Sequence, residues 1–172
     1  MIELLIVIGI IGILAAIVLV AVDPAKRLAQ ARDARRSGEA YSLLNAILNY
    51  TVDNKGIMPS ALQGLSTATT TPYMISNGGG NGCAMPNNCT RLQGGSYDSM
   101  PTTCADLYAD LVTGGFIASL PVDPRGSHAT SGFVYSQAQT GYYVQKSANN
   151  RITVGSCNPE QKPLNTGIFV TR

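Results

Sequence analysis

Four cysteines are the residues of this sequence that could most readily form covalent bonds or hold a metal. Cys83 and Cys89 are separated by five residues, Cys104 follows after fourteen more, and Cys157 after another fifty-two. A zinc ribbon needs pairs of cysteines about two to four residues apart, so this spacing does not indicate a zinc site. No Cys-x-x-Cys-His sequence is present, which excludes the usual attachment of a c-type haem.

The residue types that usually carry catalysis form no constellation. His128, the only histidine, stands in the sequence GSHATSG without a cysteine or acidic neighbour, so we interpret it as a solvated loop residue. The stretches rich in serine and glycine contain neither a G-x-S-x-G nor a phosphate-loop pattern. Four aspartates lack the ligand spacing of a calcium loop, namely Asp98, Asp106, Asp110 and Asp123. We therefore expect no enzyme activity, no cofactor and no bound metal.

Glu3 is the one charged residue in a long apolar stretch, Met1 to Val22. A helix of about 20 residues is about 30 Å long, enough to cross the hydrocarbon core of a bilayer. A carboxylate in lipid costs about 2.5–3.5 kcal/mol on insertion scales, so Glu3 either has a partner or lies solvated at the headgroup boundary. The stretch has no basic segment before it and no small-residue cleavage site after it. We therefore expect it to be retained, as an anchor or an assembly element.

Length and composition indicate one domain besides this helix. The chain has 172 residues, of which 13% are charged, and its net charge of +2 gives no reason to expect a strongly electrostatic partner such as nucleic acid. The basic residues are nevertheless concentrated directly after the apolar stretch, at Lys26, Arg27, Arg32, Arg35 and Arg36. They form either a patch on the membrane surface or a solvated helix face.

The apolar stretch ends at Asp23-Pro24, where we expect a kink or break, with Asp23 capping a helix that restarts at Pro24. From Ala25 to about Val52 the pattern becomes amphipathic. Its expected buried stripe comprises Leu28, Ala31, Ala34, Ala40, Leu44, Ile47, Leu48 and Thr51 or Val52. The opposite face holds Arg32, Asp33, Arg35, Arg36 and Glu39, and Lys55-Gly56 ends the helix. The result is one long helix whose first half is apolar all round.

The remainder predicts a loop, a short helix and a sheet. Residues 60–103 are dominated by glycine and polar residues and predict a long irregular loop. Cys104 to Thr113 predicts a short helix, ended by Gly114-Gly115, with Leu107, Tyr108, Leu111 and Val112 turned inward. We expect FVYSQ and GYYVQKS to form a hairpin, Asn149-Asn150 to turn into RITVGS, and GIFVTR to add a fourth strand. The predicted fold class is α+β, with an antiparallel sheet at residues 133–171 packed on the long helix.

Several stretches of the sequence resemble type IV pilins. The resemblance is carried by IELLIVIGIIGILAAIVL, with Glu3 and the paired Gly9 and Gly12, and by ARDARRSGEAYSLLNAILNYTVDNKG. It resumes at ADLYADLVTGGFIASLPVDPRG and TGYYV, and covers about half of the chain. The phrase LPVDPRG also resembles the major pseudopilins of type II secretion. Residues 1–24 would then be the transmembrane and filament-core helix, and residues 25–172 the head, including helix 25–55, loop 60–103 and helix 104–114.

The resemblance implies a structural function. A pilin precursor loses a short leader to a prepilin peptidase, and its new amino terminus is methylated. The subunits wait in the inner membrane, and an ATPase and a platform protein then drive them into an extracellular helical homopolymer that serves adhesion, twitching motility or DNA uptake. Glu3 would neutralise the terminal amine of a neighbouring subunit, and Gly9, Gly12 and Pro24 would allow local melting or close packing. Surfaces or DNA would be partners at the filament exterior.

The sequence departs from the pilin pattern in three ways that bear on these expectations. It starts two residues short of the pattern and carries no leader, so we expect the mature first residue to lie ahead of Met1. Val20 stands where many pilins have a proline one turn before Pro24, which leaves open where the helix unwinds. Two alternative functions remain, a pseudopilin of a secretion machine and a monomeric membrane-anchored binding protein.

An extracellular head would favour disulfides among the four cysteines. Three pairings exist, of which we favour Cys83–Cys89 with Cys104–Cys157, while Cys89–Cys104 remains open. The sequon Asn88-Cys89-Thr90 and the run that contains Ser66, Thr67, Thr69, Thr70 and Thr71 are candidate sites of glycosylation.

Overall fold

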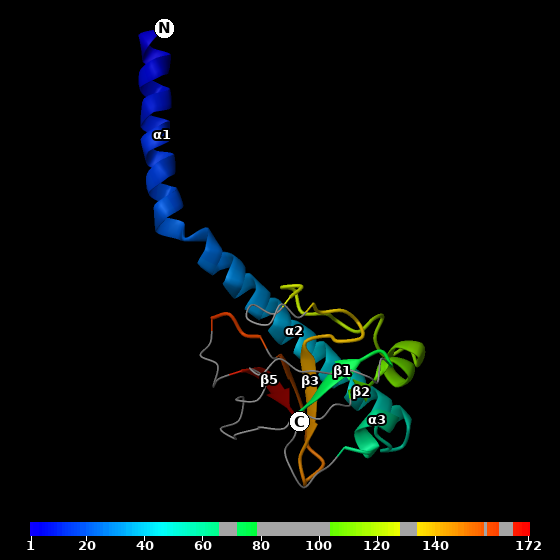
Figure 1. Cartoon of the computed structure of the whole chain (residues 1–172). Coiled ribbons are helices and arrows are strands. Elements are labelled where there is room, and N and C mark those ends of the chain that lie inside the picture. Colours follow the sequence, from blue (N-terminus) through cyan, green and yellow to red (C-terminus); the bar gives the residue numbers. More distant parts are fainter. Residues whose placement is uncertain (66–71, 79–103, 128–133, 157, 162–166) are drawn as a thin grey trace.

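Two consecutive helices dominate the computed structural model, which describes residues 1–65, 72–78, 104–127, 134–156, 158–161 and 167–172. Helix α1 spans Ile2–Val22 and helix α2 spans Pro24–Asp53 (Figure 1). Between them Asp23 adopts a left-handed backbone conformation, with φ 42° and ψ 81°, and its Oδ1 accepts a hydrogen bond of 3.2 Å from the backbone N–H of Lys26. The expected break and cap at Asp23 are thus confirmed, and Pro24 opens α2 at a position that needs no donor.

Helix α2 ends close to the predicted stop. Asn54 is its C-cap, and both Lys55 and Gly56 have positive φ, at 56° and 91°. The N–H of Gly56 donates to the carbonyl of Thr51 at 2.7 Å, which satisfies one of the last carbonyls of the helix. Glycine at this position costs nothing in the left-handed region, so the sequence signal for the end of the helix is confirmed.

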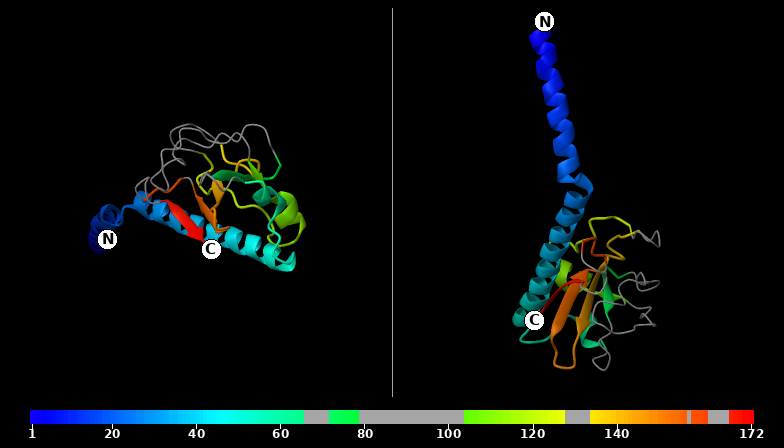
Figure 2. Two further views of the ribbon diagram at one scale, coloured as in Figure 1. Left: turned by 90° about the horizontal axis from the view of Figure 1, so that it is seen from below. Right: turned by 90° about the vertical axis from the view of Figure 1, so that its left-hand side faces the viewer.

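The head contains one mixed sheet of five strands. Its spatial order is β2 (Ala105–Asp106), β1 (Tyr73–Ser76), β3 (Tyr142–Lys146), β4 (Ile152–Ser156) and β5 (Ile168–Thr171). All neighbouring strands are antiparallel except β1 and β2, which are parallel. Helix α2 lies across one face of this sheet (Figure 2). The α+β class and the packing of the sheet on the distal helix are confirmed, whereas the expectation of a purely antiparallel sheet is wrong.

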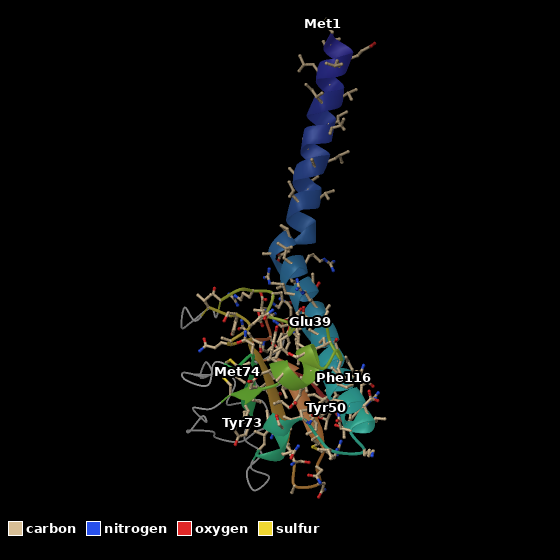
Figure 3. The ribbon with its side chains drawn as sticks, turned by 90° about the vertical axis from the view of Figure 1, so that its right-hand side faces the viewer. Met1, Glu39, Tyr50, Tyr73, Met74 and Phe116 are labelled. Carbon is tan, nitrogen blue, oxygen red and sulfur yellow. The ribbon has the colours of Figure 1, made fainter. Side chains whose placement is uncertain are left out.

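The core lies between α2 and the sheet. On the helix side Ala40, Leu43, Leu44 and Ile47 are buried, and on the strands they face residues of the same cluster, namely Tyr142, Val144, Ile152, Val154 and Val170. At the far end of α2 the ring of Tyr50 meets that of Phe116 edge to face, with 5.3 Å between centroids (Figure 3). Burial of these apolar side chains fixes α2 on the sheet, at about 25 cal/mol per Å² of apolar surface removed from water.

Three sequence predictions about the head are wrong in detail. Residues 73–76 form strand β1, inside the stretch expected to be irregular, and Ser60–Gln63 form the short helix α3. The helix expected from Cys104 begins only at Tyr108, as the π-helical turn Tyr108–Thr113, because Ala105–Asp106 is drawn into the sheet as β2; Tyr108 is exposed rather than inward. Within the expected strand FVYSQ, the described residues 134–137 do not pair with β3: Val134 and Ser136 make isolated bridges to Ser127 and Gln139. The β3–β4 hairpin around Asn150 and the final strand β5 are as expected.

Candidate assembly surface and its junction with the head

Helix α1 is an apolar rod that the head does not cover. Its segment Ile2–Leu19 has a mean hydropathy of 3.0, and none of it is buried. The helix projects away from the sheet, with Met1 at its free end (Figures 1 and 3). Twenty-one residues at 1.5 Å rise give a length of about 31 Å, close to the roughly 30 Å of a bilayer's hydrocarbon core. A core helix of a soluble protein has similar composition but is buried, so Ile2–Leu19 needs an apolar environment that the described residues of this chain do not supply.

Glu3 lies in the first turn of this rod. Its carboxylate is near the positive end of the helix dipole, which favours a negative charge there. It has no ion-pair partner among the described residues of its own chain, and it is exposed together with the apolar side chains around it. A carboxylate carried on an apolar rod is therefore available to a cation from another molecule.

Gly9 and Gly12 lie three residues apart on α1. A Cβ atom built at either position would meet nothing within 4 Å. Glycine costs about 1 kcal/mol of helix stability relative to alanine, and no contact with the described residues offsets this cost. Their small size leaves two notches in the surface of the rod, at which another helix can approach closely. In this structure α1 runs unbroken through both glycines, and the expected melting between Gly12 and Pro24 remains a prediction.

The basic residues that follow α1 differ in their burial, and one sequence expectation about them is wrong. Arg36 was expected on the solvated face, but its side chain is completely buried. It belongs to the face formed by Ala29, Ala40, Leu43 and Leu44, because positions three, four and seven residues apart share one side of a helix. Conversely Leu28, Ala31 and Ala34, which were expected to be buried, are exposed.

Arg36 is held by three carboxylates from distant parts of the chain. Its Nε and Nη2 donate to the two oxygens of Asp123 at 2.9 and 2.8 Å, and its Nη1 donates to Asp33 at 2.7 Å and to Glu160 at 2.8 Å. Burial lowers the pKa of Arg36, but its hydrogen bonds with Asp123 and the other two carboxylates outweigh that effect and the pKa is raised. The guanidinium therefore stays charged and joins α2 to the segments around residues 123 and 160.

Arg32 extends this network by one turn of helix. It binds both oxygens of Glu160 as a fork, at 2.7 and 2.5 Å. The hydrogen bond from Arg32 lowers the pKa of Glu160 to about 2, and the bond from Arg36 acts in the same direction while burial opposes both. Asp33 in turn accepts hydrogen bonds from the backbone N–H groups of Glu160 and Gln161. The C-terminal segment is thus fastened to α2 just below the junction with α1.

Glu39 closes the polar cluster on the other side. It accepts hydrogen bonds from Arg35 and from the buried hydroxyl of Tyr142. Burial, followed by the hydrogen bond to Glu39, raises the pKa of Tyr142, so its hydroxyl remains a donor. Next to Glu39 lies a groove of about 400 Å³, lined by Arg35, Ser42 and residues 117–122. Its two charged residues, Arg35 and Glu39, are paired with each other, so they are not set up as a catalytic acid and base.

Three of the four aspartates considered as calcium ligands are described, and each accepts a hydrogen bond from another residue. Asp123 is taken by Arg36, Asp110 accepts hydrogen bonds from the N–H and hydroxyl of Ser60, and Asp106 accepts one from the N–H of Tyr108. Among the described residues no group of acidic, histidine or cysteine side chains has the arrangement of a metal site. Asp98 and His128 lie outside the described residues.

Of the four cysteines, Cys104 is described, and it is disulfide-bonded. Cys83, Cys89 and Cys157 lie outside the described residues, so the preferred pairing remains a prediction. The same holds for the candidate glycosylation sites at Asn88, Ser66, Thr67, Thr69, Thr70 and Thr71.

The sequence did not predict the ion-pair joint, which is formed by Arg36 with Asp33, Asp123 and Glu160. The available signal was the helical phase of Arg36, which matches that of Ala29 and Ala40 rather than that of Arg35. Nothing local in the sequence pairs Arg36 with Asp123 or Glu160, because these contacts span 87 and 124 residues.

Comparison with protein-family profiles, with curated proteins and with solved structures returned no match to this chain.

Proposed function

We propose that this chain is the structural subunit of a type IV pilus, stored in the inner membrane through α1 and polymerised through the same helix into an extracellular filament. The observation that carries the proposal is the exposure of Ile2–Leu19 of α1, none of which is buried, beside a head that has its own core on α2. One rod can be solvated by lipid before assembly and by the α1 helices of neighbouring copies afterwards. The pilin-like sequence of α1, α2 and residues 105–126 supports the same function.

Glu3 has a specific role in this proposal. A carboxylate among apolar side chains is costly unless a cation neutralises it, and the terminal ammonium of a neighbouring subunit provides one at the same depth in the filament core. The charge-assisted bond strengthens as water is excluded. Subunits out of register would leave both charges unpaired, so the pair selects one stagger between neighbouring helices.

The proposal implies that other proteins process and assemble this chain. A prepilin peptidase would remove a leader, after which the amino terminus would be methylated, and an ATPase acting through a membrane platform would supply the energy for extraction of α1. The finished fibre would act in adhesion, twitching motility or DNA uptake, with surfaces or DNA as its exterior partners.

The test is to express the full precursor with its assembly machinery and to image shed material by electron microscopy. We expect long filaments made of this chain, with the mature N-terminus read by mass spectrometry. Glu3→Gln should abolish or strongly reduce filaments, while the control Asp53→Asn, which neutralises an exposed acid at the far end of α2, should not. Equal filament yield from Glu3→Gln would refute the register role of Glu3.

The same experiment separates the other two functions. Short, unshed filaments dependent on a secretion machine would identify a pseudopilin, which LPVDPRG at residues 120–126 also resembles. A chain that is extracted by detergent as a monomer and never forms fibres would be a membrane-anchored binding protein instead.

A further inference from the structure

Lys26 and Arg27 are the first two basic residues after α1, and both are exposed. Arg32, Arg35 and Arg36 all form ion pairs, with Glu160, Glu39 and Asp123 respectively. In the part of the chain that the structure describes, neither Lys26 nor Arg27 has an acidic side chain within ion-pair distance. Arg27 makes only a 3.4 Å contact with the amide oxygen of Gln30, and both residues are exposed. Among the described residues, three of the five basic residues after α1 are therefore ion-paired, and Lys26 and Arg27 are not.

Their depth along the chain is set by the length of α1. If the apolar rod fills the hydrocarbon core, the core ends near Val22, and Lys26 and Arg27 follow four and five residues later. At 1.5 Å per residue they lie at most about 6–8 Å further out, and less where α2 tilts at Asp23. The headgroup layer on each side of a bilayer is about 5–7 Å thick. Long basic side chains also reach along the helix toward the interface.

We infer that Lys26 and Arg27 bind the phosphate groups of anionic phospholipids where α1 leaves the membrane. Ammonium and guanidinium groups are the usual donors to phosphate oxygens, and an anionic surface attracts basic residues that flank a membrane helix. Asp23, the helix cap, is an acid of the same turn, and its single negative charge is outnumbered by the two cations, so this boundary keeps a net positive charge. This inference rests on the membrane-stored state in the proposed function and adds a lipid that must be released when α1 is extracted.

The test uses the full chain in vesicles of phosphatidylcholine with a minor fraction of phosphatidylglycerol. The protein is solubilised gently, and the number of molecules of each lipid that stay bound to one chain is measured. We expect wild-type protein to retain phosphatidylglycerol above its bulk ratio, roughly fivefold for each engaged basic residue at low salt, and less at high salt. Lys26→Gln/Arg27→Gln should return the retained lipids to the bulk ratio.

A matched control removes two exposed charges elsewhere. Lys55 follows α2 at its far end, and Arg151 follows Asn150, which shares a groove with Gly56. The variant Lys55→Gln/Arg151→Gln changes the net charge equally but leaves the junction with α1 intact, so it should keep the enrichment. Thermal melts of all three proteins in detergent should coincide, because every substituted side chain is exposed.

Two results would overturn the inference. One is enrichment in Lys26→Gln/Arg27→Gln equal to that of wild type or of the control variant. The other is loss of the enrichment when inorganic phosphate is added at constant ionic strength, since that would mark a site for free phosphate. The vesicles contain no assembly machinery, so absence of filaments in cells would refute the pilus proposal without changing this outcome.

Discussion

Arg36 donates two parallel hydrogen bonds to the carboxylate of Asp123, which lies 87 residues later in the chain, and neither side chain is exposed to solvent. The two residues come from α2 and from the connector before β3. Their pairing fixes this part of α2 against the connector before β3. Further along α2, buried leucine and isoleucine side chains fix the helix against the sheet.

Removal of Arg36 should destabilise the head strongly. Arg36→Met deletes the cation but leaves Asp123 buried with its charge uncompensated, which costs about 3–5 kcal/mol. We expect the urea midpoint of the full chain in detergent to fall accordingly. Arg35→Met is the matched control: its pair with Glu39 spans one turn of helix and its side chain is 63% exposed, so the loss should stay below about 1 kcal/mol.

The double variant Arg36→Met/Asp123→Leu distinguishes a missing charge partner from a missing side chain. Replacing both members of a buried pair by apolar residues is often neutral or stabilising, so the double variant should recover most of the loss. Stability as low as in Arg36→Met alone would mean that Asp33 and Glu160, rather than Asp123, determine the cost.

Acid should weaken the joint through Glu160. Its pKa is lowered from the ordinary value of 4.5 to about 2, chiefly by the hydrogen bond from Arg32. Between these values the unfolded chain binds more protons than the folded one, so the contribution is complete above about pH 4.5 and is lost as the pH falls toward 2. The side chain of Arg32, its main partner, is 34% exposed, so after solvent screening we expect on the order of 1–2 kcal/mol.

The measurement is a series of urea denaturations of the full chain in detergent across this pH range. Glu160→Gln cannot titrate and should show a smaller decrease in stability on acidification than wild type. It should also be less stable at neutral pH, where wild type has the full benefit of the ion pairs. Identical pH profiles for the two proteins would show that other carboxylates cause the decline.

The helices could be predicted from the sequence because their signals are local. The hydropathy of α1, the break at Asp23-Pro24 and the stop at Lys55-Gly56 all lie within the segments that they shape. The buried face of α2 was predicted correctly at Ala40, Leu44 and Ile47, where apolar residues mark it. It was predicted wrongly near Arg36, because a buried arginine looks like a surface residue until its partners are known.

The sheet was less predictable for the same physical reason. Strand β1 is four residues long and lies beside polar, glycine-rich sequence, and it pairs with β2 from beyond residue 103. Pairing with β1 extends Ala105–Asp106, where local propensity favours a helix. The candidate site was also predictable only in part. Glu3 was evident from its apolar surroundings, whereas the ion pairs of Arg32 and Arg36 depend on contacts between distant parts of the chain.

Gly155 should tolerate no side chain. It lies on β4 opposite Tyr143, and a Cβ atom there would come within 2.6 Å of the Tyr143 ring and 2.7 Å of the Ile168 carbonyl. Because one of the obstacles is backbone, Gly155→Ala should cost about 1–3 kcal/mol or more. Gly38→Ala is the control: its Cβ meets nothing within 4 Å, and in a helix interior it should stabilise the chain by up to about 1 kcal/mol. Denaturation of both variants in detergent checks the contrast, and a neutral Gly155→Ala would contradict it.

Enlarging Gly12 should separate the monomer from the filament. In the single chain a side chain at Gly12 has open space, so Gly12→Leu should leave the helix content and melting of the detergent-solubilised protein unchanged or slightly improved. If neighbouring α1 helices approach one another at this notch, the added side chain forces them apart and filament yield should fall severalfold. Val7→Leu adds one methylene group to a position that is already large and should assemble normally. Filaments of Gly12→Leu as abundant as wild type, counted by electron microscopy, would mean that the helices do not meet at Gly12.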